Sequence, residues 1–365
     1  MKHVGALDGL RAVAIAAVLA NHVIPTRGGG GGWLGVDVFF VLSGYLITTI
    51  LMSEWDRTGA IGLRRFYIRR ALRLYPALIT LVLAGAIFAP LLGNNGTARG
   101  YLLTSLVTLA YLTDLAVAAF ANSFGGLGHT WSLAVEEHFY LAWPLLLVFA
   151  LKRGRDPRWI ASAGIVVSVA FLAASGHKLV DGVPASYYSP QTQACAPLAG
   201  CLLALWLHRR TAGKLPGGAL ALVAAGGLGA LFLAAGFLPR VPYLFPELAA
   251  AVVLTAFLIL GVIEAPTSLV SRLLAVRPLR YIGKISYGIY LFHLPIITVL
   301  DHYMTGSRAV MYAVAVPAAV LAAALSYRFI ERPFLRRKDA LAPARPAPGR
   351  HARIDLTEPA SELSQ

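Results

Sequence analysis

Two polar residues, Arg11 and His22, interrupt the first apolar stretch of the chain. They are separated by about three helical turns, so in a helix they share one face and lie roughly 16 Å apart along the axis. Charged or titratable side chains inside a membrane-length apolar stretch are costly to bury, and they mark functional sites by default. Arginine is a permanent cation, whereas histidine takes up a proton near neutral pH. The pair predicts proton transfer near a fixed positive charge, within a membrane.

The composition of the whole chain is that of a membrane protein. Of its 365 residues, 58% are hydrophobic and only 13% are charged, where a soluble protein has about 25% charged residues. Apolar stretches long enough to cross a membrane recur along the sequence. They lie near 7–25, 33–52, 71–92, 101–121, 133–151, 158–175, 191–208, 217–238, 246–264, 281–300 and 309–330. We therefore predict an all-α, polytopic membrane protein that contacts the lipid bilayer along most of its length.

Other interpretations of the composition are weaker. The first stretch could be a signal peptide, but Asp8 lies early in it and no convincing cleavage site follows. The formal net charge of +15 does not indicate a nucleic-acid partner, because the basic residues cluster in short loops between the spans. Cys195 and Cys201 do not have the spacing of metal ligands, so we expect no metal site.

Lysine and arginine are concentrated in some loops and sparse in others. The basic loops are 53–70, 151–158, 208–214 and 272–284. Such loops face the cytoplasm in membrane proteins. These basic loops all lie on one side of the membrane only if one of the predicted stretches between 71 and 151 does not cross it. The stretch 101–121 contains threonine, serine and aspartate, and polar or irregular segments are tolerated at membrane depth only where protein or a cavity shields them. We predict about ten spans, with 101–121 as a re-entrant segment.

This topology predicts a multi-pass protein of the inner (plasma) membrane with both termini in the cytoplasm. Residues 1–334 would form one membrane-embedded domain. Residues 335–365 are rich in proline and arginine and are expected to form a disordered cytoplasmic tail.

Carboxylates near the outer ends of the spans are candidate partners for His22. Asp37 opens the second stretch and could reach His22 across the glycine-rich loop 25–33, while Glu136 opens the stretch 133–151. A carboxylate beside an imidazole fixes its tautomer and raises its basicity, as a general base requires. Two alternatives stay open: Asp37 caps the helix that follows it, or His22 simply lies at the membrane interface.

Arginines crowd the segment before the third stretch. Six arginines and no lysine occur between 57 and 73, and Arg69 and Arg70 lie within about one helical turn of Arg73. The planar guanidinium group suits phosphate recognition. Anionic lipid headgroups are the alternative partner.

Two further segments place polar side chains inside apolar helices. Ser286, Tyr290 and His293 follow each other at i, i+4 and i+7, so they line one face of a helix. The segment 128–140 combines aromatic residues with Glu136. An interfacial aromatic belt explains Trp131 but not the carboxylate.

Together these motifs resemble the acyltransferase-3 family of integral membrane acyltransferases, which modify bacterial surface glycans and some macrolide antibiotics. The resemblance runs from about residue 5 to 334. The motifs that carry it are Arg11-x10-His22, Gly-Val-Asp-x-Phe-Phe-x-Leu-Ser-Gly at 35–44, Arg70-x-x-Arg73, Thr-Trp-Ser-Leu-x-x-Glu-x-x-Phe-Tyr at 130–140, Ser-Tyr-x-x-Tyr-x-x-His at 286–293 and Glu-Arg-Pro at 331–333.

The resemblance implies roles for individual residues. His22 would be the catalytic histidine, Arg11 and the Arg70/Arg73 pair its essential partners, and Glu136 a carboxylate of the site. The sequence departs from the family pattern at Gln193, where relatives often have an arginine after the Ser-Pro-x-Thr turn, and at His138, where glutamine is common.

The expected activity is transfer of an acyl group, with acetyl preferred, from cytoplasmic acyl-CoA to a hydroxyl of a carbohydrate or glycosylated product. Acyl-CoA would be a co-substrate rather than a tightly bound cofactor. The expected catalytic residues are His22, Asp37 and Glu136. The expected substrate and acyl-CoA-binding residues are Arg11, Arg69, Arg70, Arg73, Ser43, Tyr45, Trp131, Ser132, Ser286, Tyr290 and His293.

Alternatives remain for both the mechanism and the class of protein. His22 could act as a general base, or it could carry the acyl group covalently. A transporter of a small anion or lipid-linked sugar would use the same intramembrane charges, but it would predict paired internal repeats, and the two halves show no clear self-similarity. A scaffold subunit of an export complex leaves the ionisable residues unexplained.

Overall fold

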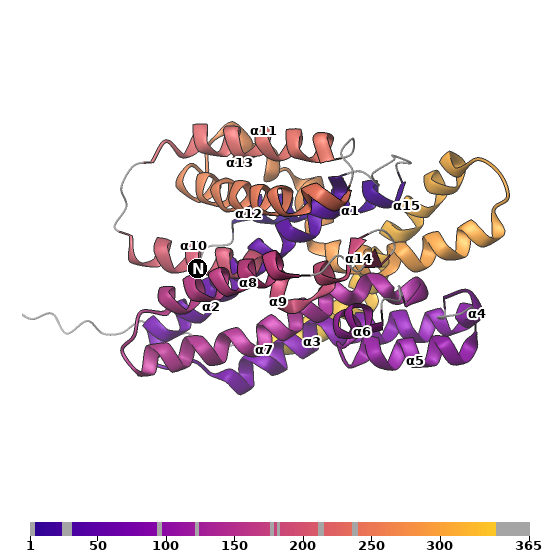
Figure 1. Ribbon diagram of the computed structural model, residues 1–365, viewed down its shortest axis with the longest axis horizontal. Helices are drawn as coiled ribbons and strands as arrows, with labels where there is room; N and C mark the ends of the chain where they lie inside the picture. The colour runs from indigo at the N-terminus through magenta and orange to yellow at the C-terminus, as the bar shows by residue number, and fades with distance from the viewer. Residues whose placement is uncertain are drawn as a thin grey trace, which may run out of the picture.

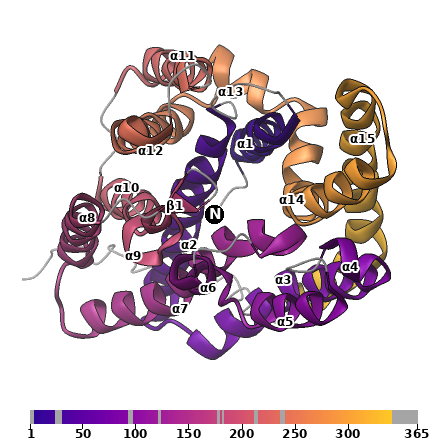
Figure 2. The same cartoon turned by 45° about the vertical axis from the view of Figure 1, so that its right-hand side comes forward.

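The protein is a bundle of long helices, and its only strands in the described residues are β1 (Leu179–Val180) and β2 (Val183–Pro184). The computed structural model describes residues 4–23, 31–92, 97–120, 124–175, 179–180, 183–210, 215–235 and 240–340. Its longer helices are α1 (Gly5–Val23), α2 (Leu34–Thr58), α3 (Leu63–Gly85), α5 (Ala98–Leu109), α6 (Thr113–Phe120), α7 (Trp131–Lys152), α8 (Pro157–Ala174), α10 (Cys195–Arg209), α11 (Gly217–Ala235), α12 (Arg240–Glu264), α14 (Arg277–Tyr303), α15 (Arg308–Ser326) and α16 (Arg332–Ala340). Figure 2 shows α1, α2 and α14 towards the middle of the bundle, with α8, α11, α15 and α5 around them.

Nine helices within the described residues are long and apolar enough to cross a membrane. This confirms the prediction of an all-α polytopic membrane protein. The predicted span 191–208 is not among the nine, because it is divided into α9 (Pro190–Gln193) and α10, which has only 15 residues.

Helix ends follow local sequence signals. Asp156 caps α8, its side chain accepting from the backbone N–H of Arg158, and Pro157 stands at the first helical position. The hydrogen bond from the Arg158 side chain also holds the pKa of the Asp156 carboxyl below its ordinary value. At the C-terminus of α2, Gly59 ends the helix with a left-handed φ of 67° and donates its N–H to the carbonyl of Trp55.

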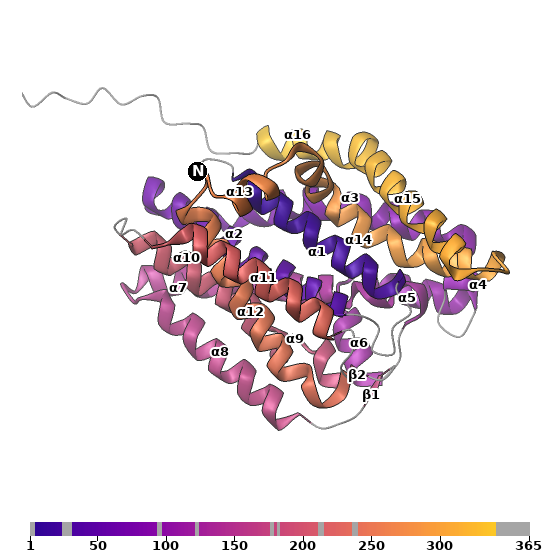
Figure 3. The ribbon, with the colours of Figure 1, turned by 90° about the horizontal axis from the view of Figure 1, so that it is seen from above.

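The basic loops meet at one end of the bundle, called here the arginine end. Three polar side-chain contacts join helix ends that are distant in the sequence: His208–Asp56 at 3.3 Å and the ion pairs Arg209–Asp156 at 2.8 Å and Arg210–Glu264 at 3.2 Å. The short helix α13 (Leu269–Leu274) and α16 lie near the N-terminus at this end (Figure 3). The prediction that these loops share one side is therefore consistent with the path of the chain.

The segment 101–121 does not form one crossing helix. It is divided into α5 and α6 by a break, at which Tyr111 has a φ of 54°. Helix α5 lies at one edge of the bundle, together with α3 and α4 (Ala89–Leu92) (Figure 1). Its polar side chains are shielded by protein, because Thr108, Thr113 and Thr130 exchange hydrogen bonds and Asp114 bonds His138 at 2.9 Å. These contacts account for the polar residues that set this segment apart in the sequence.

Two other predictions concern the ends and loops of the chain. The predicted tail from 335 begins too early, because α16 continues to Ala340; the remainder, 341–365, lies outside the described residues. Most of the glycine-rich loop 25–33 also lies outside them, and its last residues form the 3-10 turn η1 (Gly31–Trp33).

Glycines allow α1 to approach both α13 and α14 closely, and α1 and α14 together carry five of the candidate site residues: Arg11, His22, Ser286, Tyr290 and His293. A Cβ added at Gly283 would lie 1.8 Å from the backbone oxygen of Asp8, and one added at Gly9 would lie 1.8 Å from the oxygen of Leu274. Since backbone atoms cannot move aside as a flexible side chain can, these positions require glycine.

We expect Gly283→Ala to destabilise the folded protein by about 1–3 kcal/mol, because α1 and α14 must separate to admit the methyl group. Thermal unfolding in detergent would measure this loss. Gly226→Ala in α11 is the matched control, since no atom lies within 4 Å of the added Cβ. A Gly283→Ala protein as stable as the control would contradict the close packing.

Candidate active site

A pocket of about 950 Å³ opens at the arginine end between α1, α2, α3 and α7. Its basic lining residues are Arg11, Arg65, Arg69, Arg70 and Arg73. We call it the arginine chamber. Four of these residues come from α3, so the arginine-rich segment singled out in the sequence does face one cavity.

Within the chamber, Arg70 is already engaged. Its Nε and Nη2 lie 2.7 Å and 2.6 Å from Oε1 of Glu137, and its guanidinium stacks 3.0 Å from the ring centroid of Tyr140. By contrast, Arg69 and Arg73 make no ion pair with any described residue. The structure therefore gives Arg70 a partner within the protein, where the sequence suggested a substrate phosphate. Glu137 was not among the predicted site residues.

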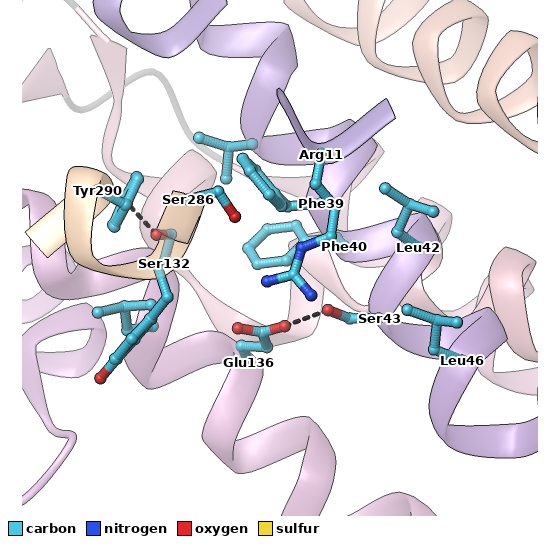
Figure 4. Close-up of a pocket in the computed structure, with 13 residues that line it drawn as sticks. Arg11, Phe39, Phe40, Leu42, Ser43, Leu46, Ser132, Glu136, Ser286 and Tyr290 are labelled. Carbon is cyan, nitrogen blue, oxygen red and sulfur yellow. Dashed lines mark hydrogen bonds between the residues drawn. The ribbon is translucent and has the colours of Figure 1, made fainter. Parts of the chain in front are cut away.

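A second pocket of about 560 Å³, the central pocket, adjoins the chamber. Figure 4 shows the Arg11 guanidinium entering it from α1, close to Glu136 and Ser43. Arg11, Ser43 and Glu136 line both pockets. The polar residues on its other walls are Ser132 of α7 and Ser286, Tyr287 and Tyr290 of α14. The structure thus brings together six of the predicted site residues from four helices.

Hydroxyl groups hold the Glu136 carboxylate at the junction of the two pockets. Ser43 and Tyr140 both donate to its Oε1, Tyr140 at 2.7 Å. This carboxylate therefore lies at the Arg11 end of α1, about three helical turns from His22. The hydrogen bonds place Glu136 beside Arg11 and Ser43 rather than beside the imidazole that it was expected to orient.

Three histidines gather at the other end of α1. The ring of His293 lies 5.2 Å from that of His22 and 5.2 Å from that of His129, measured between centroids. Tyr290, which lines the central pocket, is 5.5 Å from His293 and donates its hydroxyl to the carbonyl of His129 at 2.7 Å. Because that proton is used, Ser132 is the donor in its 2.5 Å contact with the Tyr290 oxygen.

Backbone carbonyls of α14 fix the tautomers of two of these histidines. Pro295 has no N–H, so the carbonyl of Leu291 lacks its usual helical partner and lies 3.2 Å from Nε2 of His129. Nδ1 of His293 lies 2.6 Å from the carbonyl of Tyr290. Since a carbonyl only accepts, both of these ring nitrogens carry the hydrogen, and in neutral rings the opposite nitrogens are acceptors.

His129 was missed as a site residue by sequence reasoning. It belongs to the 3-10 turn η4 (Gly125–Thr130), where helical periodicity gives no indication of a side chain's direction. The sequence contained one indication of this contact, namely Pro295. Because Pro295 has no N–H, the carbonyl of Leu291, four residues earlier, has no helical partner and can accept from His129.

Asp37 does not contact His22. Its side chain is fully buried, and neither carboxylate oxygen has a hydrogen-bond partner among the described residues. It shares a face of α2 with Val41 and Gly44, which pack against α10, whereas Phe40 and Ser43 face the central pocket. The predicted Asp37–His22 hydrogen bond is therefore not formed. Asp37 does not cap α2 either, because the N-cap position is Trp33 and no side-chain cap hydrogen bond is formed there.

Three predicted binding residues lie outside both pockets: Tyr45, Trp131 and His293. Tyr45 is buried in the core. Trp131 packs 5.0 Å from the Tyr187 ring and 5.1 Å from the Tyr188 ring in the 3-10 turn η5 (Ala185–Tyr188). No group of three or more histidine, cysteine, aspartate or glutamate side chains within the described ranges could hold a metal ion.

Comparisons with known proteins agree with the motifs. A family model described as an acyltransferase domain matches residues 4–328. Peptidoglycan O-acetyltransferase OatA of Listeria monocytogenes is 34% identical over 357 residues, which cover 91% of this chain and 56% of the relative. O-acetyltransferase OatA of Staphylococcus aureus is 33% identical over 358 residues, covering 92% of this chain and 58% of the relative. The putative peptidoglycan O-acetyltransferase YrhL of Bacillus subtilis is 32% identical over 351 residues, covering 91% and 55%.

The chain therefore spans a little over half the length of these relatives. No solved structure matches it. The family match covers nearly all of the membrane bundle, including both pockets and the three histidines. The chain belongs to the acyltransferase-3 family of integral membrane acyltransferases.

Proposed function

We propose that the protein transfers an acetyl group from acetyl-CoA to a hydroxyl of a cell-wall carbohydrate. The observation that carries the proposal is the pair of adjoining pockets: a chamber lined by arginines, and a central pocket lined by Tyr290, whose ring lies 5.5 Å from that of His293, the neighbour of His22. The relatives that are named peptidoglycan O-acetyltransferases support acetyl as the group and carbohydrate as the acceptor.

The donor would bind with its phosphates in the arginine chamber. Arg69 and Arg73 have guanidinium groups without an ion-pair partner in the described part of the chain, and charge-assisted hydrogen bonds to phosphate are among the strongest available. The pantetheine arm would pass Arg11 and Ser43 into the central pocket. From there it would run along α1, over the rise of roughly 16 Å to His22.

At the histidine end, His22 would act as the general base. Its imidazole nitrogen takes the proton of the acceptor hydroxyl while the oxygen attacks the thioester carbonyl, and the C–S bond then breaks as the tetrahedral intermediate collapses. The proton passes from His22 to the sulfur of the departing CoA. The Ser132 hydroxyl, which donates to Tyr290 in this structure, is placed to turn towards the developing oxyanion.

The arginine end would face the cytoplasm, in the plasma membrane. The clustering of basic loops at this end supports that orientation, and acyl-CoA is a cytoplasmic metabolite. Both termini would then lie in the cytoplasm. The acceptor would reach His22 from the opposite side.

The assay that tests the proposal measures transfer of labelled acetyl groups from acetyl-CoA by the purified protein, in the presence of peptidoglycan fragments. We expect Arg73→Ala to raise the KM for acetyl-CoA about tenfold to a hundredfold, because it removes a charged hydrogen bond to phosphate, with kcat changed much less.

Arg64→Ala is the matched control, since Arg64 is exposed on the same helix and does not line the chamber. Equal KM values for the two variants would contradict the chamber as the CoA site. A folded wild-type protein that neither binds nor consumes acetyl-CoA would contradict acetyl transfer itself and favour transport.

A further inference from the structure

A groove on the outside of the bundle belongs to neither of the two site pockets. It has a volume of about 1410 Å³ and lies between α8, α10 and α12. Helices α8 and α12 both pack against α10, which lies between them (Figure 2). Helix α10 has 15 residues, fewer than a membrane span needs, and one of its faces forms the floor of the groove.

The groove is apolar over most of its length. Its sides include Trp159 of α8, which is 78% exposed, and Phe257 of α12, which is 44% exposed. Exposed apolar surface of this size marks a binding surface, and in a membrane protein acyl chains can cover it. The floor follows one face of α10 at i, i+3, i+4 and i+7, namely Ala199, Leu202, Leu203 and Trp206.

One end of the groove is polar and carries a net positive charge. Asp156 and Arg158 line this end, and Oδ2 of Asp156 lies 2.6 Å from Nη2 of Arg158 and 2.8 Å from Nη1 of Arg209. One carboxylate cannot neutralise two guanidinium groups, so one positive charge remains unbalanced. Arg153 and Arg155, exposed in the adjacent loop between α7 and α8, form no ion pair with a described residue and add to this charge.

Two tryptophans indicate the depth of this end in the membrane. Trp159 follows Arg158 in the first turn of α8, and Trp206 lies in the last turn of α10, where the guanidinium of Arg210 is 4.7 Å from its ring centroid. Tryptophan is enriched at the level of the lipid headgroups. The arginines at the end of the groove would therefore lie at the depth of lipid phosphates, and the apolar floor at the depth of acyl chains.

We propose that the groove binds an anionic phospholipid of the bilayer. Its phosphate lies between Arg158 and Arg209, and an acyl chain lies along Leu203 and Trp206. Charge complementarity selects this occupant, because guanidinium groups form strong charge-assisted hydrogen bonds to phosphate and the headgroup neutralises the unbalanced charge. A second copy of the chain fits less well, because a two-fold dimer in one membrane would bring two positive ends together.

The bound lipid would support the helix behind the candidate site. Helix α10 packs closely against α2, since a Cβ added at Gly200 would lie 2.0 Å from the carbonyl oxygen of Val41. Helix α2 in turn carries Ser43, which lines both pockets. A ligand that binds only the folded protein stabilises it, so we expect the lipid to raise the temperature of unfolding. The groove lies outside both pockets, and the proposal does not depend on acetyl transfer.

The test is native mass spectrometry of the full chain, stripped of lipid and mixed with equal amounts of phosphatidylglycerol and phosphatidylcholine. We expect the wild type to retain phosphatidylglycerol with about a tenfold preference, the effect of a charged hydrogen bond to phosphate. Arg158→Gln should abolish the preference, because Arg209 then only balances Asp156. Arg153→Gln is the matched control, since Arg153 is exposed at the same end and does not line the groove.

A second variant tests the apolar part without changing a charge. Ala256 lines the groove on α12, and Ala256→Phe should fill the groove and reduce the retention of both lipids. Ala230→Phe is its control, because Ala230 is exposed on α11 and lies outside the groove. Thermal unfolding in lipid-free detergent identifies variants that are folded as well as the wild type.

Three results would overturn the proposal. The first is equal retention of the two lipids by the wild type. The second is a preference for phosphatidylglycerol that a folded Arg158→Gln protein keeps. The third is a lipid-free dimer in light scattering that Ala256→Phe converts to a monomer, which would assign the groove to a second copy of the chain.

Discussion

His22→Ala should lower kcat for acetyl transfer by about 10²–10⁴-fold, the usual contribution of a general base. The KM for acetyl-CoA should change little, because the basic residues of the arginine chamber lie about three helical turns away along α1. Alanine also leaves the fold intact, since His22 is only half-buried near the end of its helix. Steady-state kinetics in detergent, with labelled acetyl-CoA and a peptidoglycan fragment, would measure both constants.

The same variant separates proton abstraction from a covalent route. If His22 carried the acetyl group, the wild-type protein would retain label after a rapid denaturing quench in the absence of acceptor, and His22→Ala would not. We expect no retained label in either protein, because His22 acts on the acceptor hydroxyl. His302→Ala, at an exposed position of α14, is the control for loss of a histidine. Full activity in His22→Ala would remove the histidine from the mechanism.

The sequence could predict those parts of the site that depend on one helix. Arg11 and His22 mark the two ends of a single face of α1, and Ser286, Tyr290 and His293 follow one face of α14. The helical repeat is sufficient to group such residues, because it is a local property of the backbone. Ser286 and Tyr290 line the central pocket together, and His293 continues their face to His22.

Features that depend on which helices are neighbours could not be predicted in this way. Asp37 lies next to the pocket-lining residues in the sequence, but one step along a helix turns its side chain towards α10. The bond between His129 and the Leu291 carbonyl joins residues 162 positions apart. Likewise, Arg70 binds Glu137 only because α3 lies against the first turns of α7.

The Arg70–Glu137 pair leads to a second large effect, this time on stability. Arg70→Met should destabilise the protein by about 3 kcal/mol, because it leaves the largely buried Glu137 carboxylate without its partner. Glu137→Leu should cost less, since Arg70 keeps the Tyr140 ring and Glu136, which lies 4.0 Å away. Thermal unfolding in detergent would rank the two variants.

Combining the substitutions should recover most of the stability. Replacing both partners of a buried ion pair with apolar groups of similar volume is often nearly neutral, and a methionine sulfur packs favourably on an aromatic ring such as that of Tyr140. A double variant that is as unstable as Arg70→Met would show that the loss does not come from an unpaired carboxylate.

The stable double variant then distinguishes the two possible roles of Arg70. If Arg70 held a CoA phosphate, the KM for acetyl-CoA would rise in the double variant as much as in Arg73→Ala, however well the protein folds. If Arg70 organises the wall of the chamber through Glu137 and Tyr140, that KM should rise far less than in Arg73→Ala. We expect the second result, because Glu137 already occupies the Nε/Nη2 edge of the guanidinium, the edge through which a phosphate would be bound by two hydrogen bonds.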